Sequence, residues 1–326
     1  MRLLVSGASG FIGSHVARHL AAVGHEVLAV GRDRARLAPA QQAGCRTLTV
    51  DLAGDDLMDA VQGQSAIIHC AARASPWGRP EEFQRDNVQA TERLLAAAAD
   101  AGTVRRFVHL SSPSIYFRFR DQRDLSEEFL PPERWPTHYA KTKWQSECSV
   151  RRFPALGPII LRPRAVFGPG DRAIVPRLIA VAERGFFPLP SGGSAWTDVT
   201  YIDNVVTAVA AALEAPASLG GRAFNITNDE PVQIRDLLAR LFGTLGIRTR
   251  MLPMPRAMLM ALARGSESLS WHFRAGKEPR ITLYGAGLLS FSQTLSIEAA
   301  RRDLAYTPVI SLDEGFRRFA DWWRAR

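Results

Sequence analysis

Tyr139 and Lys143 stand four positions apart, and on a helix this spacing places two side chains on one face. A lysine ammonium beside a phenol stabilises the phenolate and lowers the pKa of the tyrosine. The phenol can then give or take a proton near neutral pH. Such a pair also arises by chance, with an ordinary surface tyrosine as the alternative, so its surroundings must decide.

A serine-rich segment, Ser111-Ser112-Pro113-Ser114, follows an apolar run over residues 106–110 that we expect to be a strand. Parallel α/β sheets bind their ligands at the carboxyl ends of their strands. A serine hydroxyl at that edge can hydrogen-bond a substrate carbonyl or the alkoxide derived from it.

A glycine-rich turn with the spacing GxxGxxG lies between the first expected strand and a helix that opens near Phe11. Such glycines permit a tight turn and let the backbone approach a pyrophosphate, which the helix N-terminus attracts. A simple glycine-rich turn is the alternative, but the position at the start of a βαβ series favours dinucleotide binding. The residues that we assign to the cofactor here are Gly7, Ser9, Gly10, Phe11, Ile12 and Gly13.

The end of the second expected strand indicates which dinucleotide binds. An acidic residue there would bond the ribose hydroxyls, but this chain has Gly31-Arg32-Asp33-Arg34. Gly31 leaves room, and Arg32 can bond the oxygens of a 2′-phosphate, which favours NADP(H) over NAD(H). Two alternatives stay open: Asp33 serving the ribose, and Arg32 as a solvated loop charge. Asp51 and Leu52, after the third strand, fit the adenine edge.

Short apolar runs alternate with amphipathic stretches over the first 110 residues, which predicts strand–helix units in an α/β, Rossmann-type, doubly wound parallel sheet. We expect residues 1–165 to form the cofactor-binding domain, with the Tyr139–Arg152 helix in it. Residues 166–326 would form a smaller, mixed substrate-binding region, with some segments returning to the first domain. Strands are expected at residues 2–6, 26–30, 46–50, 66–69, 106–110, 158–162 and 222–227, and helices at 83–101, 139–152, 201–215 and 231–245.

Composition excludes several classes of protein. The 326 residues carry a net charge of +9, but only three of the 41 basic residues are lysines, and the arginines are scattered. A nucleic-acid surface would cluster them on one face, so we expect no nucleic-acid partner. Three widely spaced cysteines argue against a disulfide framework and a zinc site, and we expect no metal. No signal peptide and no apolar run of about 18–20 residues is found, so we expect a cytoplasmic protein without a transmembrane segment.

These motifs together resemble the extended short-chain dehydrogenase/reductase superfamily, over nearly the whole chain. The matching segments are the glycine turn, His69-Cys70-Ala71-Ala72, Asn87, Ser111-Ser112, Tyr139 with Lys143, and residues 161–171. The resemblance implies that Tyr139 is the acid/base, that Lys143 lowers its pKa and binds the nicotinamide ribose, and that Ser112 polarises the carbonyl. It also implies cofactor contacts at Ala71, Ala72, Asn87, Pro163 and Val166, and a homodimer formed through helices of the cofactor half.

Within the superfamily the chain is similar to the 3β-hydroxysteroid dehydrogenase branch, and most of all to bacterial 2-alkyl-3-oxoalkanoate reductases. The similar segments are Thr200–Val206, 278–282, 292–296 and 299–308. Nucleotide-sugar epimerases typically have Asn where this chain has Ala165, and an acidic residue at the end of the second strand. The implied activity is NADP(H)-dependent interconversion of a secondary alcohol and a ketone on a β-hydroxy/β-keto long-chain acid or a 3-hydroxysteroid.

Two other activities remain open: a nucleotide-sugar epimerase or dehydratase with tightly bound NAD, and a carbonyl reductase like dihydroflavonol reductase. Association with partner enzymes of a lipid pathway is a further expectation. Ser114, Arg164 and Arg280 are candidate substrate residues, and each arginine is either a carboxylate ligand or part of a structural ion pair.

Residues 251–276 hold four of the six methionines among leucines and aromatics. Flexible thioethers suit a pliable hydrocarbon pocket or lid. A buried helix, or a helix that contacts a membrane or a partner protein, are the alternatives.

Overall fold

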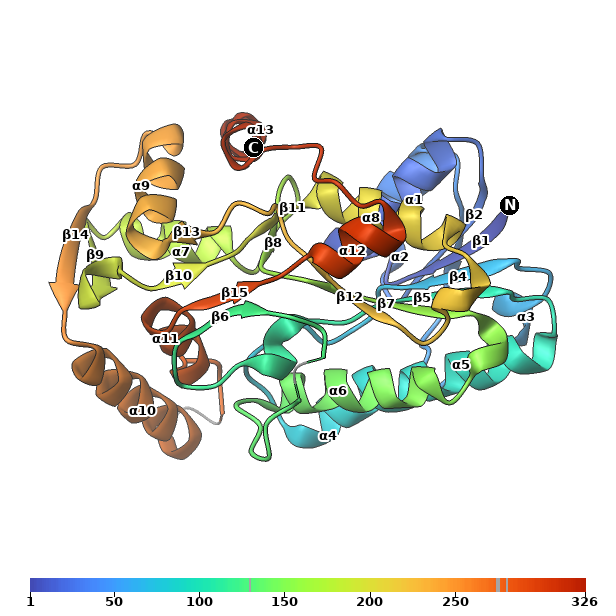
Figure 1. The fold of residues 1–326 in the computed structure, drawn as a ribbon, viewed down its shortest axis with the longest axis horizontal. Coiled ribbons are helices and arrows are strands. Elements are labelled where there is room, and N and C mark those ends of the chain that lie inside the picture. The colour runs from blue at the N-terminus through green and yellow to red at the C-terminus, as the bar shows by residue number, and fades with distance from the viewer. Residues whose placement is uncertain (129, 274–275, 280) are drawn as a thin grey trace.

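A seven-stranded, all-parallel sheet forms the centre of the molecule in the computed structural model, which describes residues 1–128, 130–273, 276–279 and 281–326 (Figure 1). Its strand order is β12-β7-β5-β4-β1-β2-β3. The strands are β1 (Arg2–Ser6), β2 (Glu26–Gly31), β3 (Arg46–Thr49), β4 (Ala66–His69), β5 (Arg106–Leu110), β7 (Pro158–Pro163) and β12 (Ala223–Ile226). The predicted α/β, Rossmann-type fold is confirmed.

Helices cover both faces of this sheet (Figure 1). One layer contains α1 (Phe11–Ala22), α2 (Arg34–Gln42), α8 (Ile202–Glu214) and α12 (Glu298–Leu304). The other contains α3 (Met58–Val61), α4 (Pro80–Phe83), α5 (Ala90–Ala101) and α6 (His138–Arg151). Successive side chains of β1 alternate between the two cores: Leu3 and Val5 pack toward α1, and Leu4 packs toward α5. Burial on both faces explains why the strands are apolar throughout.

The helix expected over residues 83–101 is interrupted. A π-helical turn, Gln84–Gln89, separates α4 from α5. The wider π-helical turn directs the Asn87 side chain inward. There its Oδ1 accepts a hydrogen bond from the Arg73 N–H at 2.7 Å, and its Nδ2 donates to Thr142 Oγ1 at 3.0 Å. These bonds tie the loop after β4 to α6, and π-turns of this kind often occur at functional sites.

A second region, with its own core, packs at the carboxyl edge of the large sheet (Figure 1). Its mixed sheet has the order β13-β10-β15-β6, and two strand pairs, β11-β8 and β14-β9, complete it. The strands are β6 (Gln122–Leu125), β8 (Val166–Phe167), β9 (Phe186–Pro190), β10 (Trp196–Thr197), β11 (Thr200–Tyr201), β13 (Val232–Gln233), β14 (Arg250–Met254) and β15 (Gln293–Leu295). The helices are α7 (Val175–Ala182), α9 (Ile234–Leu245), α10 (Arg256–Phe273), α11 (Leu283–Ser290) and α13 (Leu312–Arg324). Because β6 comes from the first half of the chain and β12 from the second, the two regions interlock.

The methionine-rich segment forms β14 and α10. Leu259, Met260 and Ala263 are buried against α11, whereas other apolar side chains of α10, among them Leu262 and Phe273, are exposed. The far end of α10 contacts the loop after β4, where the Trp271 and Trp77 rings lie 4.9 Å apart. The segment is thus a core helix on one face only. No helix among the described residues is long and apolar enough to span a bilayer.

Candidate active site

The glycine turn lies where β1, β2 and β4 end. Gly7 has a φ of +69°, and a Cβ there would lie 2.6 Å from the Ala71 nitrogen. A Cβ on Gly13 would lie 2.4 Å from the Gly7 carbonyl oxygen, and one on Gly31 would lie 2.5 Å from Ser9 Oγ. No side chain caps the N-terminus of α1 at Gly10, so its first amides remain available to an anion. Close backbone packing therefore requires three of these glycines, and the turn can hold a pyrophosphate.

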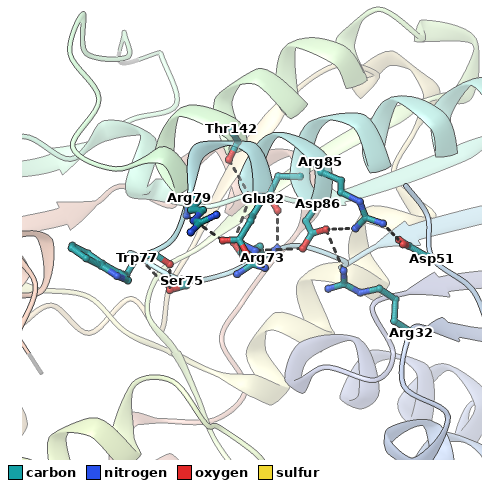
Figure 2. A network of polar contacts seen from close by, with 11 residues as sticks. Arg32, Asp51, Arg73, Ser75, Trp77, Arg79, Glu82, Arg85, Asp86 and Thr142 are labelled. Carbon is teal, nitrogen blue, oxygen red and sulfur yellow. Dashed lines mark hydrogen bonds and ion pairs between the residues drawn. The ribbon is translucent and has the colours of Figure 1, made fainter. Parts of the chain in front are cut away.

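Three arginines gather on one buried carboxylate beside this turn (Figure 2). The guanidinium groups of Arg32, Arg73 and Arg85 lie 3.2, 3.4 and 2.9 Å from Asp86, which is only 8% exposed. Arg85 also pairs with Asp51 at the end of β3. Arg32 is therefore ion-paired and not simply a solvated loop charge, although its side chain is 58% exposed.

Asp33 is engaged elsewhere. Its carboxylate caps α2 by accepting from the Arg36 N–H at 3.2 Å, and it pairs with the Arg36 guanidinium at 3.1 Å. Arg34 begins α2. Asp33, which would bind the ribose in the NAD(H) alternative, thus already has two bonds to Arg36. Arg32, directly after Gly31, is paired with Asp86 but is more than half exposed, so it can still reach a phosphate.

Ser112, Tyr139 and Lys143 come together where β5 ends and α6 begins. Thr137 caps α6, and the first turn of the helix carries Tyr139. Burial raises the pKa of the Tyr139 phenol, and a hydrogen bond with Ser112 opposes that rise. Lys143 is 2% exposed, and its ammonium donates to the Leu110 carbonyl at 2.6 Å.

The expected lowering of the Tyr139 pKa by Lys143 is not seen. Burial governs the phenol, and the Lys143 ammonium is directed to the Leu110 carbonyl and lies 3.4 Å from His109 Nε2. Burial also lowers the pKa of Lys143 itself to about 8, against the charge of Glu147. The lysine is thus a desolvated cation on the same helix as the phenol, directed toward the carboxyl end of β5.

Two buried histidines lie near Lys143: His69, which belongs to one of the segments that carry the family resemblance, and His109, which sequence reasoning did not identify. His69 ends β4, and its ring lies 5.4 Å from that of His109 on β5. His69 Nδ1 shares a hydrogen bond with Ser6 Oγ at 2.7 Å, and Nε2 shares one with Thr91 Oγ1 at 2.8 Å. Burial and the charge of Lys143 lower the pKa of His69 to about 3, so the ring stays neutral beside the ammonium.

A buried ion pair supports the catalytic helix. Glu147, one turn after Lys143, receives two hydrogen bonds from Arg162 of β7, at 2.9 and 2.6 Å. Ser111 Oγ donates to the same carboxylate at 2.5 Å. Of the two adjacent serines, Ser111 is therefore committed to Glu147, whereas the Ser112 hydroxyl accepts from the Ser114 N–H at 3.2 Å and meets Tyr139.

The remaining expected cofactor contacts lie along the same edge of the sheet. Ala71 and Ala72 follow β4, Pro163 ends β7, and Val166 begins β8. Leu52 is buried, whereas the carboxamide of Asn87 is hydrogen-bonded to Arg73 and Thr142. Asn87 therefore holds the loop that approaches the glycine turn.

Two of the three candidate substrate residues lie among the residues that the structure describes. Arg164 and Ser114 are both buried, and Arg280 lies outside the described residues. Burial raises the pKa of the Tyr284 phenol on α11 to about 12, with the Arg164 charge opposing and Tyr139 adding to the rise. Tyr284, which sequence reasoning did not identify, is thus close to both the reacting phenol and Arg164.

Residues 3–227 match the NAD dependent epimerase/dehydratase family. The chain belongs to this family. The resemblance to the extended short-chain dehydrogenases/reductases is confirmed at that level, and the cofactor class of the family is the nicotinamide dinucleotides.

Relatives of this epimerase/dehydratase family member extend over nearly its whole length. The Escherichia coli protein YbjS is 37% identical over 334 residues, covering 99% of this chain and 98% of that protein. A 2-alkyl-3-oxoalkanoate reductase of Stenotrophomonas maltophilia is 33% identical, covering 98% of each chain. The decarboxylating sterol-4-alpha-carboxylate 3-dehydrogenase of Mus musculus is 30% identical, covering 96% of this chain and 88% of the enzyme.

Solved structures agree on the fold. The UDP-glucuronic acid 4-epimerase of Bacillus cereus in complex with NAD has a TM-score of 0.79, with 100% of this chain and 99% of that chain covered. Its sequence is only 23% identical, so this likeness concerns the fold alone.

Proposed function

We propose that this chain is an NADP(H)-dependent oxidoreductase that interconverts a secondary alcohol and a ketone on a large apolar substrate. The observation that carries the proposal is the hydrogen bond between Ser112 and Tyr139, beside the buried Lys143 and the glycine turn. The closely packed glycines and the uncapped start of α1 fit a dinucleotide.

In this proposal the bound nicotinamide supplies or accepts the hydride. Ser112 donates a hydrogen bond to the substrate oxygen and holds it against the phenol. Tyr139 gives its proton to that oxygen during reduction and takes it back during oxidation. Lys143, whose ammonium donates to the Leu110 carbonyl, would bind the nicotinamide ribose and so hold the cofactor beside the phenol.

Two relatives support the substrate class. The name of one describes a ketone on a branched alkanoate, and that of the other a sterol carbinol next to a carboxylate. We place this chain with them, in the 3β-hydroxysteroid dehydrogenase-like branch. The same proposal includes a cofactor-binding part at residues 1–165 and a homodimer. It also includes contacts with partner enzymes of a lipid pathway, and a role for α10 as a lid or a docking surface.

A nucleotide-sugar epimerase is the second candidate, favoured by the fold of the solved structures. Such an enzyme returns its hydride to the same substrate and consumes no NADPH. Ala165 and Gly31 disfavour this candidate, because neither residue can make the polar contacts expected of an epimerase at these places.

The test is NADPH oxidation against long-chain β-keto acids, 3-ketosteroids and aryl ketones. Tyr139→Phe should reduce turnover by about 100-fold or more, because it removes the proton donor, and should leave NADPH binding nearly unchanged. Tyr201→Phe is the control, since Tyr201 packs against Phe167, in the core of the second region. Undiminished reduction by Tyr139→Phe would overturn the assignment.

A further inference from the structure

Polar side chains form a row on the inner face of the small sheet. Thr197 of β10 pairs in register with Gln293 of β15, and Gln293 pairs with Gln122 of β6, so these three side chains point to one side. Gln293 is fully buried, yet neither its Oε1 nor its Nε2 has a hydrogen-bond partner among the described residues. Buried amides are nearly always paired, so this one calls for a ligand.

Arg164 joins this row. Its Nη2 lies 3.4 Å from Thr197 Oγ1, and its Nε has no partner among the described residues. Within that part of the chain no carboxylate lies within 4.0 Å of the Arg164 guanidinium. Asp198 acts on it only from farther away and accepts a hydrogen bond from the Leu295 N–H at 2.7 Å. The structural ion pair that was the alternative for Arg164 is therefore not formed.

Arg162, two residues earlier, shows how a buried guanidinium is normally satisfied in this fold. Arg162 and Arg164 are 2% and 5% exposed, but Arg162 is held by both oxygens of Glu147. A buried charge without such a counter-ion is costly, and arginine keeps its proton even when buried. Among the described residues Arg164 has no such close counter-ion, and a bound anion would supply one.

Tyr284 links the polar row to the catalytic groups. The Tyr284 phenol interacts with the charges of both Arg164 and Tyr139. The ring of Phe117, which follows the short helix starting after Ser112, lies 5.1 Å from that of Tyr284. Ser114, on the same short helix, is 2% exposed, and its hydroxyl has no partner in the described part of the chain.

We propose that Arg164 and Gln293 form a subsite for the carboxylate of the substrate, so that the substrate is a β-hydroxy or β-keto acid. This inference rests on the proposed function. A planar, singly charged carboxylate matches one guanidinium and a neutral amide donor. A nucleotide diphosphate would bring at least two negative charges to a single arginine, with Asp198 nearby, which the charge balance disfavours.

The experiment compares three stable alcohols with NADP⁺: 3-hydroxydodecanoate, its methyl ester, and undecan-2-ol, which lacks the carboxylate. The wild type should prefer the acid by about tenfold or more in kcat/KM. Arg164→Met should lose about 10- to 100-fold on the acid, mainly through KM, and should keep its rate on undecan-2-ol. Gln293→Leu, which removes no charge, should raise the KM for the acid alone by a smaller factor. Arg235→Met, an exposed arginine outside the row, is the control.

A binding measurement separates this inference from the proposed function. Dodecanoate, which cannot react, should bind the wild type in calorimetry and bind Arg164→Met at least about tenfold more weakly. Equal kcat/KM of the wild type on the acid and its ester would overturn the subsite. So would an equal loss of kcat/KM on the acid and on undecan-2-ol in both Arg164→Met and Gln293→Leu. Either result would leave the proposed oxidoreductase activity in place. Dodecanoate binding through Arg164 in a chain that oxidises none of the alcohols would support the subsite and count against the proposed function.

Discussion

At the residue scale, neighbouring side chains of the same type have different partners. Ser111 donates to the buried Glu147, whereas Ser112 meets Tyr139. Arg162 completes the same ion pair, while no carboxylate of the described chain forms a close ion pair with Arg164, and Asp198 acts on it only from farther away. Arg162 lies on β7, whereas Arg164 follows its last residue, Pro163, so the direction of the Arg164 side chain is not set by the alternation of the strand. Residue type alone could not reveal these differences.

Arg32 carries the preference for NADP(H) that we propose. Arg32→Ala should raise the KM for NADPH by about tenfold or more and change that for NADH little, because only the 2′-phosphate receives charge-assisted bonds from the guanidinium. Steady-state kinetics with both cofactors give the answer. Arg36→Ala is a matched control, since Arg36 is also 58% exposed and also pairs with an aspartate. Equal losses for both cofactors would remove the preference.

At the element scale, the sequence predicted what is local and periodic. β1, β4 and β5 begin and end at the expected residues, because each is an apolar run bounded by polar residues or glycine. The glycine turn and the start of α1 follow from the same pattern. Tyr139 and Lys143 could also be found, because their spacing is a property of one helix.

The elements that depend on distant partners could not be predicted. β6 is a short, polar strand whose partner, β15, lies about 170 residues later, so no local pattern marks it. The π-turn between α4 and α5 is stabilised by Arg73 and Thr142, which are far from Asn87 in sequence. His109 and Tyr284 belong to no motif, and only the folded chain brings them to the site.

Two glycines inside helices have opposite roles. Gly13→Ala in α1 should cost about 1–3 kcal/mol of unfolding free energy and weaken NADPH binding, because its Cβ would collide with the Gly7 carbonyl. Gly243→Ala in α9 meets nothing within 4 Å and should add about 0.5–1 kcal/mol. Denaturant unfolding, together with cofactor titration, measures both effects. A neutral Gly13→Ala would mean that the turn does not need this close approach.

At the scale of the whole molecule, many of the arginines form ion pairs on the surface or belong to the arginine group around Asp86. Arg317 and Arg318 share Glu314, and Arg301 pairs with Asp229 and Glu298. Exposed pairs of this kind contribute little to stability. The charges that matter for folding are the buried ones, at Lys143, Glu147 and Arg162, and the histidines that must stay neutral near them.

Acid should therefore destabilise the fold through His69. Its pKa is about 3 in the folded chain, against 6.5 for the free side chain, because it is buried beside Lys143. Between these values the unfolded chain binds more protons. The contribution of His69 is thus complete above pH 6.5 and is lost as the pH falls toward 3. Each such group adds up to about 1.4 kcal/mol per pH unit to the slope.

His69→Gln removes this titration while an amide can still bond Ser6 or Thr91. The slope of the unfolding free energy between about pH 6 and pH 4.5, from urea denaturation, should fall by about 1.4 kcal/mol per pH unit relative to the wild type. His19→Gln, at an exposed histidine of α1, is the control. If His69→Gln left the slope of the unfolding free energy unchanged, His69 would not stay neutral in the folded chain. The inference that Lys143 has neutral surroundings would then be wrong.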